Sequence, residues 1–435
     1  MSALADAVAR SRAVAEIVVA EGALDGAADA YRRHFGDAPA MVVADANTWA
    51  AAGERVAAAL GAPAHVLDAA PRPRPSTEAG RAVAAALGDR IPVAVGSGVL
   101  NDLAKFAAHE RDRRYLCVPT AASMDGYASA GAPLSDAGFK KTIPCRAPVA
   151  ILADLGVIAA APRRMAGWGY GDLAGKAPAG GDWILADALG IEPIDDDAWP
   201  MVQDALPGWL SRPEAVAAGE PGALAALFDG LAVSGLAMEV HGSSRPASGA
   251  DHQIAHVWEM EGLARDGEAV AHGACVAVGC LVTLRLYDWL LGRDLARIDP
   301  GALAAAAPPE EAEMAEIDAR LPPAVAERAR EETRAKRLSR RDHEARLAEV
   351  AATWPALRER LARHLPREGE MRAKLEAAGA PVRPEEIGVG PARLAGTIRA
   401  ARTIRSRYTV LDLLAQCGLL DAAIAGTVPA PGRAA

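Results

Sequence analysis

The sequence has few aromatic residues, no excess of positive charge and no CxxC pair of cysteines. Aromatic residues make up 4% of the 435 residues while alanine is heavily used, which favours closely packed helices over a β-sandwich. The net charge of −9 predicts no general binding to nucleic acid or anionic membranes, because such binding needs a basic surface. The five cysteines are scattered along the chain, which fits a reducing compartment.

The sequence also predicts neither a targeting segment nor a membrane span. No basic stretch followed by an apolar segment opens the chain, so we expect a cytoplasmic location. The longest apolar stretch, near residues 269–291, contains histidine, arginine and aspartate and therefore predicts a buried helix rather than a membrane span.

The length and the order of expected elements predict two domains. A chain of 435 residues exceeds the usual limit for one hydrophobic core. Strands are expected at Glu16–Ala20, Pro39–Ala44, His65–Leu67, Ile91–Val95, Tyr115–Pro119 and Pro148–Asp154. Because helices separate these strands, residues 1–160 are predicted to form an α/β dinucleotide-binding domain with a mostly parallel sheet. Residues 161–435 are predicted to form an all-α domain for metal and substrate.

A charged helical stretch spans residues 308–365. Its early part is acidic and its late part is basic, and a solvated helical face is the interpretation that we prefer. A surface that binds a partner protein is the alternative.

A glycine turn follows the strand at Ile91–Val95. Gly96, Ser97 and Gly98, then Val99 and Leu100, lead directly into an expected helix. Strand, glycine turn and helix is the geometry that offers backbone N–H groups and a positive helix end to a diphosphate. The usual GxGxxG pattern is not present, and an ordinary tight turn is the alternative interpretation.

Polar side chains follow two further strands at their carboxyl ends, where α/β sheets keep their binding sites. Asp45 is placed to bind a ribose hydroxyl pair, although by itself a helix cap is the preferred interpretation. The stretch from Thr120 through Ser123 and Asp125 to Ser129 offers hydroxyls for phosphate or ribose and a carboxylate for a substrate hydroxyl. A turn with local side-chain hydrogen bonds is the alternative here.

Two histidines lie four residues apart in the stretch SRPASGADHQIAH. Ser248 and Gly249 are suited to begin a helix, so His252 and His256 are expected on one helix face. Two imidazoles on one face suit either one metal ion, or a metal and a substrate. His272 opens the next apolar run, and Asp172 lies far upstream in GYGD, so both are further candidate ligands.

Five segments occur in the order and at the separations of one known family. The segments are GSGVLNDLAK, PTAASMDGYAS, GYGDLAGK, SRPASGADHQIAH and AHG. Together they resemble the glycerol-1-phosphate dehydrogenases, which belong with the iron-alcohol-dehydrogenase and dehydroquinate-synthase-like enzymes. The resemblance covers residues 16–291 and extends more loosely to 405–412.

The resemblance implies roles for individual residues. The implied metal ligands are Asp172, His252 and His272. His256 is implied to contact substrate, with Asp125 and Asp172, and Asp172 and His256 are the expected catalytic residues. The implied contacts to NAD or NADP are Gly96, Ser97, Gly98, Val99, Leu100, Thr120, Ser123 and Ser129, with Asp45 on the adenosine ribose. Asp251 stands where the family more often has glutamate, which leaves a supporting role for it open.

The implied reaction is reversible reduction of dihydroxyacetone phosphate to sn-glycerol 1-phosphate by NAD(P)H with one divalent metal. One carboxylate and two neutral imidazoles leave positions open for a substrate oxygen, as catalytic metal sites do. Zinc is the expected metal, while nickel and iron suit the same ligands. Two alternatives stay open: a same-fold enzyme such as a glycerol dehydrogenase or a cyclising lyase, and an inactive protein that binds nucleotide or metal.

The substrate phosphate and the oligomeric state are less defined by the sequence. The basic residues nearest the motifs are Lys140, Lys141, Lys176 and Arg245, and none is preferred. The carboxylate of Asp45 favours NAD, because it would repel the 2′-phosphate of NADP. A homodimer is plausible from the family resemblance alone.

Overall fold

The computed structural model describes residues 2–136 and 139–428, which divide into two compact units. Unit 1 comprises residues 1–173, 197–244 and 377–379, and unit 2 comprises 174–196, 245–376 and 380–435. The sequence predicts domains of 1–160 and 161–435, and this remains a prediction. Unit 1 additionally takes in segments from the second predicted domain, since 197–244 and 377–379 pack with it.

A parallel sheet forms the centre of unit 1, in the strand order β1-β8-β5-β4-β2-β3. Its strands are β1 (Glu16–Ala20), β2 (Ala40–Asp45), β3 (Ala64–Leu67), β4 (Ile91–Gly96), β5 (Leu116–Pro119) and β8 (Ala150–Asp154). Strands β2, β5 and β8 are buried along their whole length, as expected for a sheet covered on both faces. The predicted α/β fold class with its parallel sheet is confirmed.

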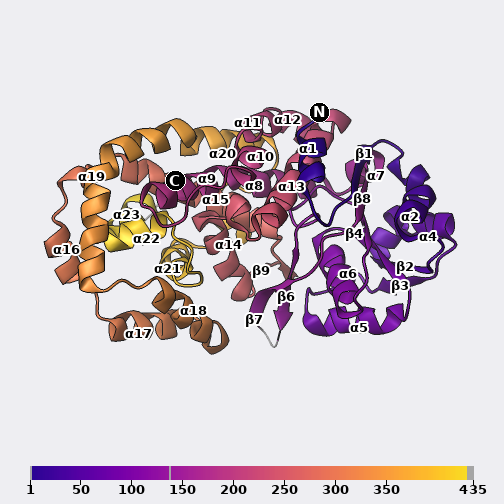
Figure 1. Ribbon diagram of the computed structural model, residues 1–435, viewed down its shortest axis with the longest axis horizontal. Helices are drawn as coiled ribbons and strands as arrows, with labels where there is room; N and C mark the ends of the chain where they lie inside the picture. The colour runs from indigo at the N-terminus through magenta and orange to yellow at the C-terminus, as the bar shows by residue number, and fades with distance from the viewer. Residues whose placement is uncertain (1, 137–138, 429–435) are drawn as a thin grey trace. The chain divides into compact units, whose positions relative to one another are not determined.

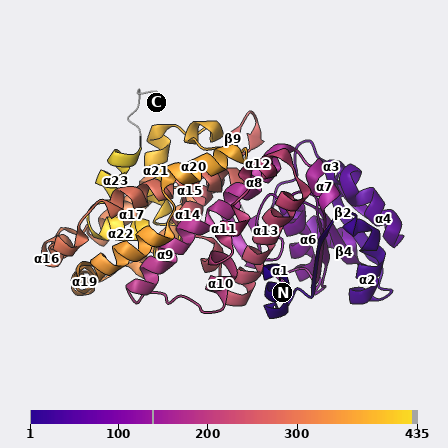
Figure 2. The same ribbon diagram turned by 90° about the horizontal axis from the view of Figure 1, so that it is seen from above.

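Helices cover both faces of this sheet. Helix α6 (Gly98–Glu110) lies on one side of β4, and α2 (Ala27–Phe35) and α4 (Glu54–Leu60) lie on the other (Figures 1 and 2). Helix α5 (Thr77–Leu87) packs on α6. The core between α2, α4 and the sheet is aliphatic, with Val42, Val93 and Val118 fully buried. This packing holds the carboxyl ends of the strands, and the loops that follow them, in fixed positions.

An antiparallel hairpin interrupts the parallel pattern and was not predicted from the sequence. Strand β6 (Gly131–Asp136) pairs with β7 (Phe139–Pro144). Gly131, Pro133 and Pro144 lie within these strands, and such residues weaken the sequence signal for a strand. The hairpin therefore depends on pairing between two segments more than on their own propensity.

Most of the remaining helices of unit 1 pack around a long apolar helix. The remaining helices are α1 (Ala3–Arg10), α3 (Ala46–Thr48), α7 (Leu155–Ala160), α8 (Arg163–Ala174), α10 (Ala198–Gln203), α11 (Leu206–Trp209), α12 (Pro213–Ala218) and α13 (Pro221–His241). Helix α13 contacts α1, α7, α10 and β1. Helix α8 ends at Ala174, and α9 (Lys176–Ala188) follows in unit 2.

Unit 2 is helical, as predicted for the C-terminal part. Its helices are α9, α14 (Ala250–Met260), α15 (His272–Leu291), α16 (Pro300–Ala306), α17 (Glu310–Arg320), α18 (Pro323–Lys336), α19 (Arg340–His364), α20 (Glu368–Ala377), α21 (Pro391–Ala401), α22 (Val410–Gln416) and α23 (Leu420–Thr427). A two-stranded ribbon, β9 (Ala264–Arg265) with β10 (Glu268–Ala269), connects α14 to α15. Helix α14 therefore ends at Met260, before this ribbon begins.

Two helices are long and apolar enough to cross a membrane by length and composition. They are α13 and α15, and 67% and 83% of their apolar windows are buried. Core helices pass the same test, so this finding agrees with the predicted buried helix at 269–291. All five cysteines are buried free thiols, and Cys275 and Cys280 lie in α15.

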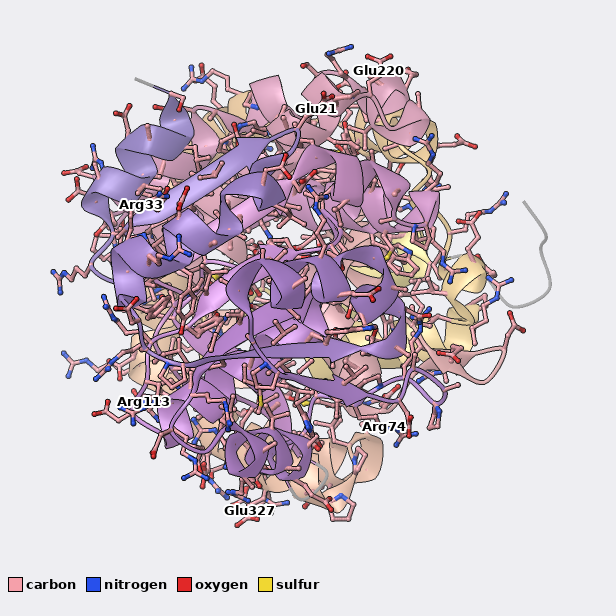
Figure 3. The ribbon with its side chains drawn as sticks, turned by 90° about the vertical axis from the view of Figure 1, so that its right-hand side faces the viewer. Glu21, Arg33, Arg74, Arg113, Glu220 and Glu327 are labelled. Carbon is pink, nitrogen blue, oxygen red and sulfur yellow. The ribbon has the colours of Figure 1, made fainter. Side chains whose placement is uncertain are left out.

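Charges of both signs are spread over the surface of unit 1. Glu21, Arg33, Arg74 and Arg113 are exposed side chains that point outward (Figure 3). In unit 2 the charged stretch 308–365 forms helices α17, α18 and α19, with ion pairs such as Arg334 Nε to Glu310 Oε1 at 2.8 Å. Charged residues of this stretch thus also connect its helices to one another.

Candidate active site

The glycine turn after β4 has the predicted geometry. Strand β4 ends at Gly96, Ser97 is the N-cap and α6 begins at Gly98. The Ser97 hydroxyl makes no capping hydrogen bond to α6 within the described residues, and Ser97, Gly98 and Val99 are half-buried. The first N–H groups of a helix have no intrahelical acceptor. The turn therefore offers backbone donors at a positive helix end, as a diphosphate site requires.

The loop after β5 carries Thr120, Ser123, Asp125 and Ser129, and a buried lysine holds it in place. Lys105 Nζ donates to the carbonyl oxygens of Gly126 and Gly131, both at 2.9 Å, and contacts Ser129 Oγ at 3.3 Å. The Lys105 side chain is fully buried, and Asp102 Oδ1 lies 3.7 Å from its Nζ. We did not identify Lys105 from the sequence, although it is the last residue of GSGVLNDLAK and its spacing places it two turns along α6.

Two glycines let this loop approach neighbouring helices closely. A Cβ at Gly169, in α8, would lie 2.0 Å from the carbonyl oxygen of Ala122. A Cβ at Gly235, in α13, would lie 2.6 Å from the carbonyl oxygen of Asp125. The first glycine of GYGD is therefore required by packing against the loop.

Asp125 and Asp172 are linked directly. The backbone N–H of Asp125 donates to Asp172 Oδ2 at 2.9 Å. Asp172 is fully buried and Asp125 is 8% exposed. The backbone of Asp125 and the carboxylate of Asp172, 47 residues apart in the sequence, are thus in direct contact in unit 1.

Asp45 ends β2 and caps α3. Its Oδ1 accepts from the backbone N–H of Thr48 at 2.8 Å, and the Thr48 hydroxyl pairs with the Asp45 backbone in a capping box. Oδ1 of Asp45 therefore acts as a helix cap, which was the alternative interpretation from the sequence. Its contact with a ribose remains a prediction.

Asp182 fixes the start of the helix that carries the histidines. Helix α14 begins at Ala250, as the capping residues predicted, and Asp182 Oδ2 accepts from the Ala250 N–H at 2.7 Å. Asp182 Oδ1 accepts from the Tyr287 hydroxyl at 2.6 Å and the Val410 N–H at 2.8 Å. Burial raises the pKa of Asp182 to about 6 against these hydrogen bonds. Asp182 carries no motif signal and was missed.

Arginines support the same segment from its other side. Arg245 is fully buried and donates to the carbonyl oxygens of Asp182 at 2.8 Å and Tyr408 at 3.1 Å. Arg407 Nη1 donates to the carbonyl oxygen of Ser248 at 2.7 Å. Burial lowers the pKa of Arg407 to about 9, and the positive charge of Arg245 adds to this effect. These contacts explain why the segment SRPASG and residues 405–409 occur together in the sequence pattern.

The other candidates for phosphate binding differ in their surroundings. Lys176 is fully buried in α9, and Lys141 Nζ pairs with Asp136 Oδ2 at 2.5 Å. The side chain of Lys140 lies outside the described residues.

Three histidines come together in unit 2. The ring centroids of His252 and His272 are 5.4 Å apart, those of His252 and His256 are 6.1 Å apart, and those of His256 and His272 are 5.6 Å apart. His252 is almost completely buried, whereas His256 and His272 have side chains that are 22% and 28% exposed. Helix spacing alone placed His252 beside His256, and packing of α14 on α15 brings His272 to them.

Carboxylates contact the Nδ1 atom of each histidine. Asp251 Oδ2 lies 2.6 Å from His252 Nδ1. Glu259 places Oε2 at 2.8 Å from His256 Nδ1 and Oε1 at 2.8 Å from His272 Nδ1. Asp251 therefore does support His252 despite its short side chain, and Glu259 was missed because no motif contained it.

The donor chemistry fits a divalent metal. A histidine that donates Nδ1–H to a carboxylate keeps its Nε2 lone pair for a ligand, and metal-binding histidines commonly have such a partner. His252 and His272 both meet this condition. His256, Glu259 and His272 also form a group whose ligand atoms lie within 4.8 Å of one another.

Comparisons with known proteins give consistent matches. A family model described as iron-containing alcohol dehydrogenase matches residues 18–162. The chain is 37% identical over 272 residues to glycerol-1-phosphate dehydrogenase [NAD(P)+] of Bacillus velezensis, covering 60% of this chain and 68% of that protein. It is 30% identical over 333 residues to the protein of the same name from Geobacillus thermodenitrificans, covering 76% and 72%.

Solved structures share the fold across nearly the whole chain. A probable glycerol dehydrogenase from Sinorhizobium meliloti superposes with a TM-score of 0.62 at 18% identity, covering 96% of this chain and 98% of the other. Maleylacetate reductase from Agrobacterium tumefaciens superposes with a TM-score of 0.57 at 18% identity, with the same coverage of both chains. At this identity the likeness shows the fold, and the function must come from the site.

Proposed function

Because the chain belongs to the glycerol-1-phosphate dehydrogenase family, we propose that it reversibly reduces dihydroxyacetone phosphate to sn-glycerol 1-phosphate with NAD(P)H. It is an NAD(P)-dependent oxidoreductase. The observation that carries the proposal is the histidine cluster, in which every Nδ1 atom contacts a carboxylate. Such an arrangement prepares Nε2 atoms to bind a metal and a substrate.

The proposed ligands of one divalent cation are Asp172, His252 and His272. One carboxylate and two neutral imidazoles are a donor set that suits zinc and leaves a position for a substrate oxygen. Zinc is our first choice, and nickel or iron are accommodated by the same donors. The contact between His252 Nδ1 and Asp251 supports this role, because it leaves His252 Nε2 as the atom that binds a ligand.

NAD(P)H is proposed to bind at the turn after β4 and the loop after β5. The backbone of Gly96 to Leu100 would hold the diphosphate, and Thr120, Ser123 and Ser129 would contact the cofactor. The second oxygen of Asp45 would accept from the adenosine ribose, which favours NAD over NADP because a carboxylate repels a 2′-phosphate. The half-buried turn and the fixed loop support this assignment.

The substrate is proposed to contact Asp125, Asp172 and His256. When bound, the metal polarises the substrate oxygen and the cofactor supplies or accepts the hydride. Asp125 would bind a substrate hydroxyl, and the Asp172 hydrogen bond to the Asp125 N–H orients that residue. His256 would exchange a proton with the substrate through Nε2, while Glu259 holds its Nδ1. A homodimer and a cytoplasmic location complete the proposal.

Two other functions remain to be separated from this one. A same-fold glycerol dehydrogenase or cyclising lyase would use another substrate, and a lyase would show no net consumption of NADH. An inactive binding protein would bind NADH and metal without turnover. The supported histidine cluster argues against an inactive protein, since a binding role alone does not need a prepared His256.

The test is NADH oxidation by purified, metal-reconstituted protein with dihydroxyacetone phosphate, followed by chiral analysis of the product. Metal-dependent formation of sn-glycerol 1-phosphate is the expected result. Parallel assays with NADPH, glycerol, and zinc, nickel or iron assign the cofactor and the metal. Binding of NADH without turnover under all these conditions would contradict the proposed substrate.

A further inference from the structure

We propose that Glu259 is a positioning residue whose single carboxylate fixes both His256 and His272, and so links substrate binding to metal binding. The inference rests on the proposed function in one respect, because it takes His272 as a metal ligand and His256 as a substrate contact. It goes beyond the ligand set, which does not include Glu259.

The geometry gives Glu259 one oxygen for each ring. His256 and Glu259 lie three residues apart on α14, so their side chains share a face. His272 is the first residue of α15, which packs against α14. Oε2 and Oε1 each lie 2.8 Å from an Nδ1 atom, a normal hydrogen-bond length.

The chemistry of the carboxylate determines the tautomer of both rings. An ionised carboxylate only accepts hydrogen bonds, so each contacted Nδ1 must carry the hydrogen. A neutral imidazole with Nδ1–H has its lone pair at Nε2. Glu259 therefore leaves His272 with Nε2 as the metal-binding atom and His256 with Nε2 as the acceptor for a substrate hydroxyl.

The two rings are also held in one orientation. Their planes are inclined by only 20° with centroids 5.6 Å apart, and the Glu259 side chain is 10% exposed. A carboxylate shielded from water in this way binds its partners more strongly than an exposed one. Rotation of either ring would break a hydrogen bond to the shared group, so the two positions depend on each other.

Direct binding of the metal by His256, Glu259 and His272 is the competing arrangement, because their ligand atoms lie within 4.8 Å. Both Glu259 oxygens are already at hydrogen-bond distance from ring nitrogens, and this favours the positioning role. The two arrangements differ in what Glu259→Gln does. A glutamine amide has one acceptor oxygen and one donor nitrogen, so it can keep only one of the two rings in its present tautomer.

The experiment measures zinc affinity of the full-length protein by competition with a chromophoric chelator, in the absence of substrate and cofactor. Glu259→Gln is expected to lower zinc affinity by about 10- to 100-fold, the range found for partners of metal-binding histidines. It is also expected to lower kcat at saturating zinc, because His256 is affected as well. Glu259→Asp should retain one of the two contacts and give a smaller loss of both.

Two further variants separate the role of Glu259 from general damage. Glu261→Gln removes a nearby carboxylate of the same type that pairs with Arg393 at 2.8 Å, and should leave zinc affinity and kcat unchanged. Asp251→Ala removes the carboxylate that contacts His252 but neither contact of Glu259, and should lower zinc affinity with a smaller effect on kcat at saturating zinc. Circular dichroism of each variant reports whether the fold is kept.

The outcomes distinguish the inference from the proposed function. Loss of zinc affinity in Glu259→Gln supports the inference even if the wild-type protein does not reduce dihydroxyacetone phosphate. Wild-type zinc affinity and kcat in a folded Glu259→Gln variant would overturn it. Complete loss of zinc from Glu259→Gln and Glu259→Asp, with His252→Ala still binding zinc, would instead identify Glu259 as a direct ligand. A wild-type protein that binds no zinc, nickel or iron would overturn the ligand set and the role of Glu259 together.

Discussion

Asp172 Oδ2 accepts a hydrogen bond of 2.9 Å from the backbone N–H of Asp125, and so joins the end of α8 to the loop after β5. One carboxylate oxygen of Asp172 thereby orients the proposed substrate loop. The proposed metal role of Asp172 and its loop role can be separated by substitution.

We expect Asp172→Asn to lower kcat/KM by at least about 100-fold, corresponding to loss of about 3 kcal/mol of transition-state stabilisation. The asparagine side chain can still accept from the Asp125 N–H through its carbonyl oxygen, so the thermal midpoint should stay close to that of the wild type. Asp172→Ala should abolish turnover and also release the loop. Steady-state kinetics, zinc content and a thermal melt check this, and a folded Asp172→Ala variant with normal activity would remove Asp172 from the ligand set.

Lys105→Met is expected to raise KM for NADH and to lower the unfolding free energy. The change removes the Lys105 hydrogen bonds to the carbonyl oxygens of Gly126 and Gly131. Each lost bond costs about 1 kcal/mol, because the Ser129 hydroxyl still contacts both oxygens. Looser placement of Ser129 should weaken cofactor binding more than it changes kcat.

The matched control is Lys374→Met, which replaces a half-buried lysine of α20. Urea unfolding and NADH titration of both variants are the measurements. Equal KM for NADH in Lys105→Met and the wild type would show that the lysine does not position the loop.

Gly169→Ala is expected to destabilise the protein by about 1–3 kcal/mol or more, as overpacking of a close contact does. The added Cβ would lie 2.0 Å from the Ala122 carbonyl oxygen, so the loop that carries Ser123 and Asp125 must move. The control is Gly396→Ala in α21, where a Cβ meets nothing within 4 Å. That change should be neutral or stabilising by up to about 1 kcal/mol, because alanine favours a helix. Chemical denaturation measures the unfolding free energy of both variants. Similar values for the two would contradict the close approach of Gly169 to the Ala122 carbonyl oxygen.

Asp182 predicts a specific pH dependence of stability. Burial raises the pKa of this acid from 3.8 to about 6 in the folded protein. A raised pKa means that its contribution is fully present below about pH 4 and is lost as pH rises through about 6. At about 1.4 kcal/mol per pKa unit, the loss amounts to about 3 kcal/mol.

Asp182→Asn removes this titration, although it also disturbs the hydrogen bonds from Ala250, Tyr287 and Val410. The difference in unfolding free energy between variant and wild type should therefore shift in favour of the variant between pH 4 and pH 7. Urea unfolding at several pH values measures it. A difference that stays constant with pH would show that the Asp182 pKa is not raised.

Local patterns in the sequence were sufficient for most of the first 160 residues. Runs such as Met41-Val42-Val43 and Val93-Ala94-Val95 are buried on both faces, so hydrophobicity alone located the strands. The pairing of β6 with β7 was missed because its stability comes from contacts between two segments, and neither segment alone has a clear strand pattern.

The candidate site also contains some features that the sequence predicts and others that only the packing of the chain creates. The sequence by itself determined the glycine turn, the HxxxH spacing and the family, because these depend on short separations along the chain or on segments kept in order. Only the tertiary structure decided that Glu259 serves both His256 and His272, that Lys105 holds the loop of Ser129, and that Asp182 caps α14. Those side chains lie on ordinary helices, and no motif assigned a role to them. Their roles depend on short distances between residues that are far apart in the sequence. Those distances are set by how the helices pack, and spacing along the chain does not encode them.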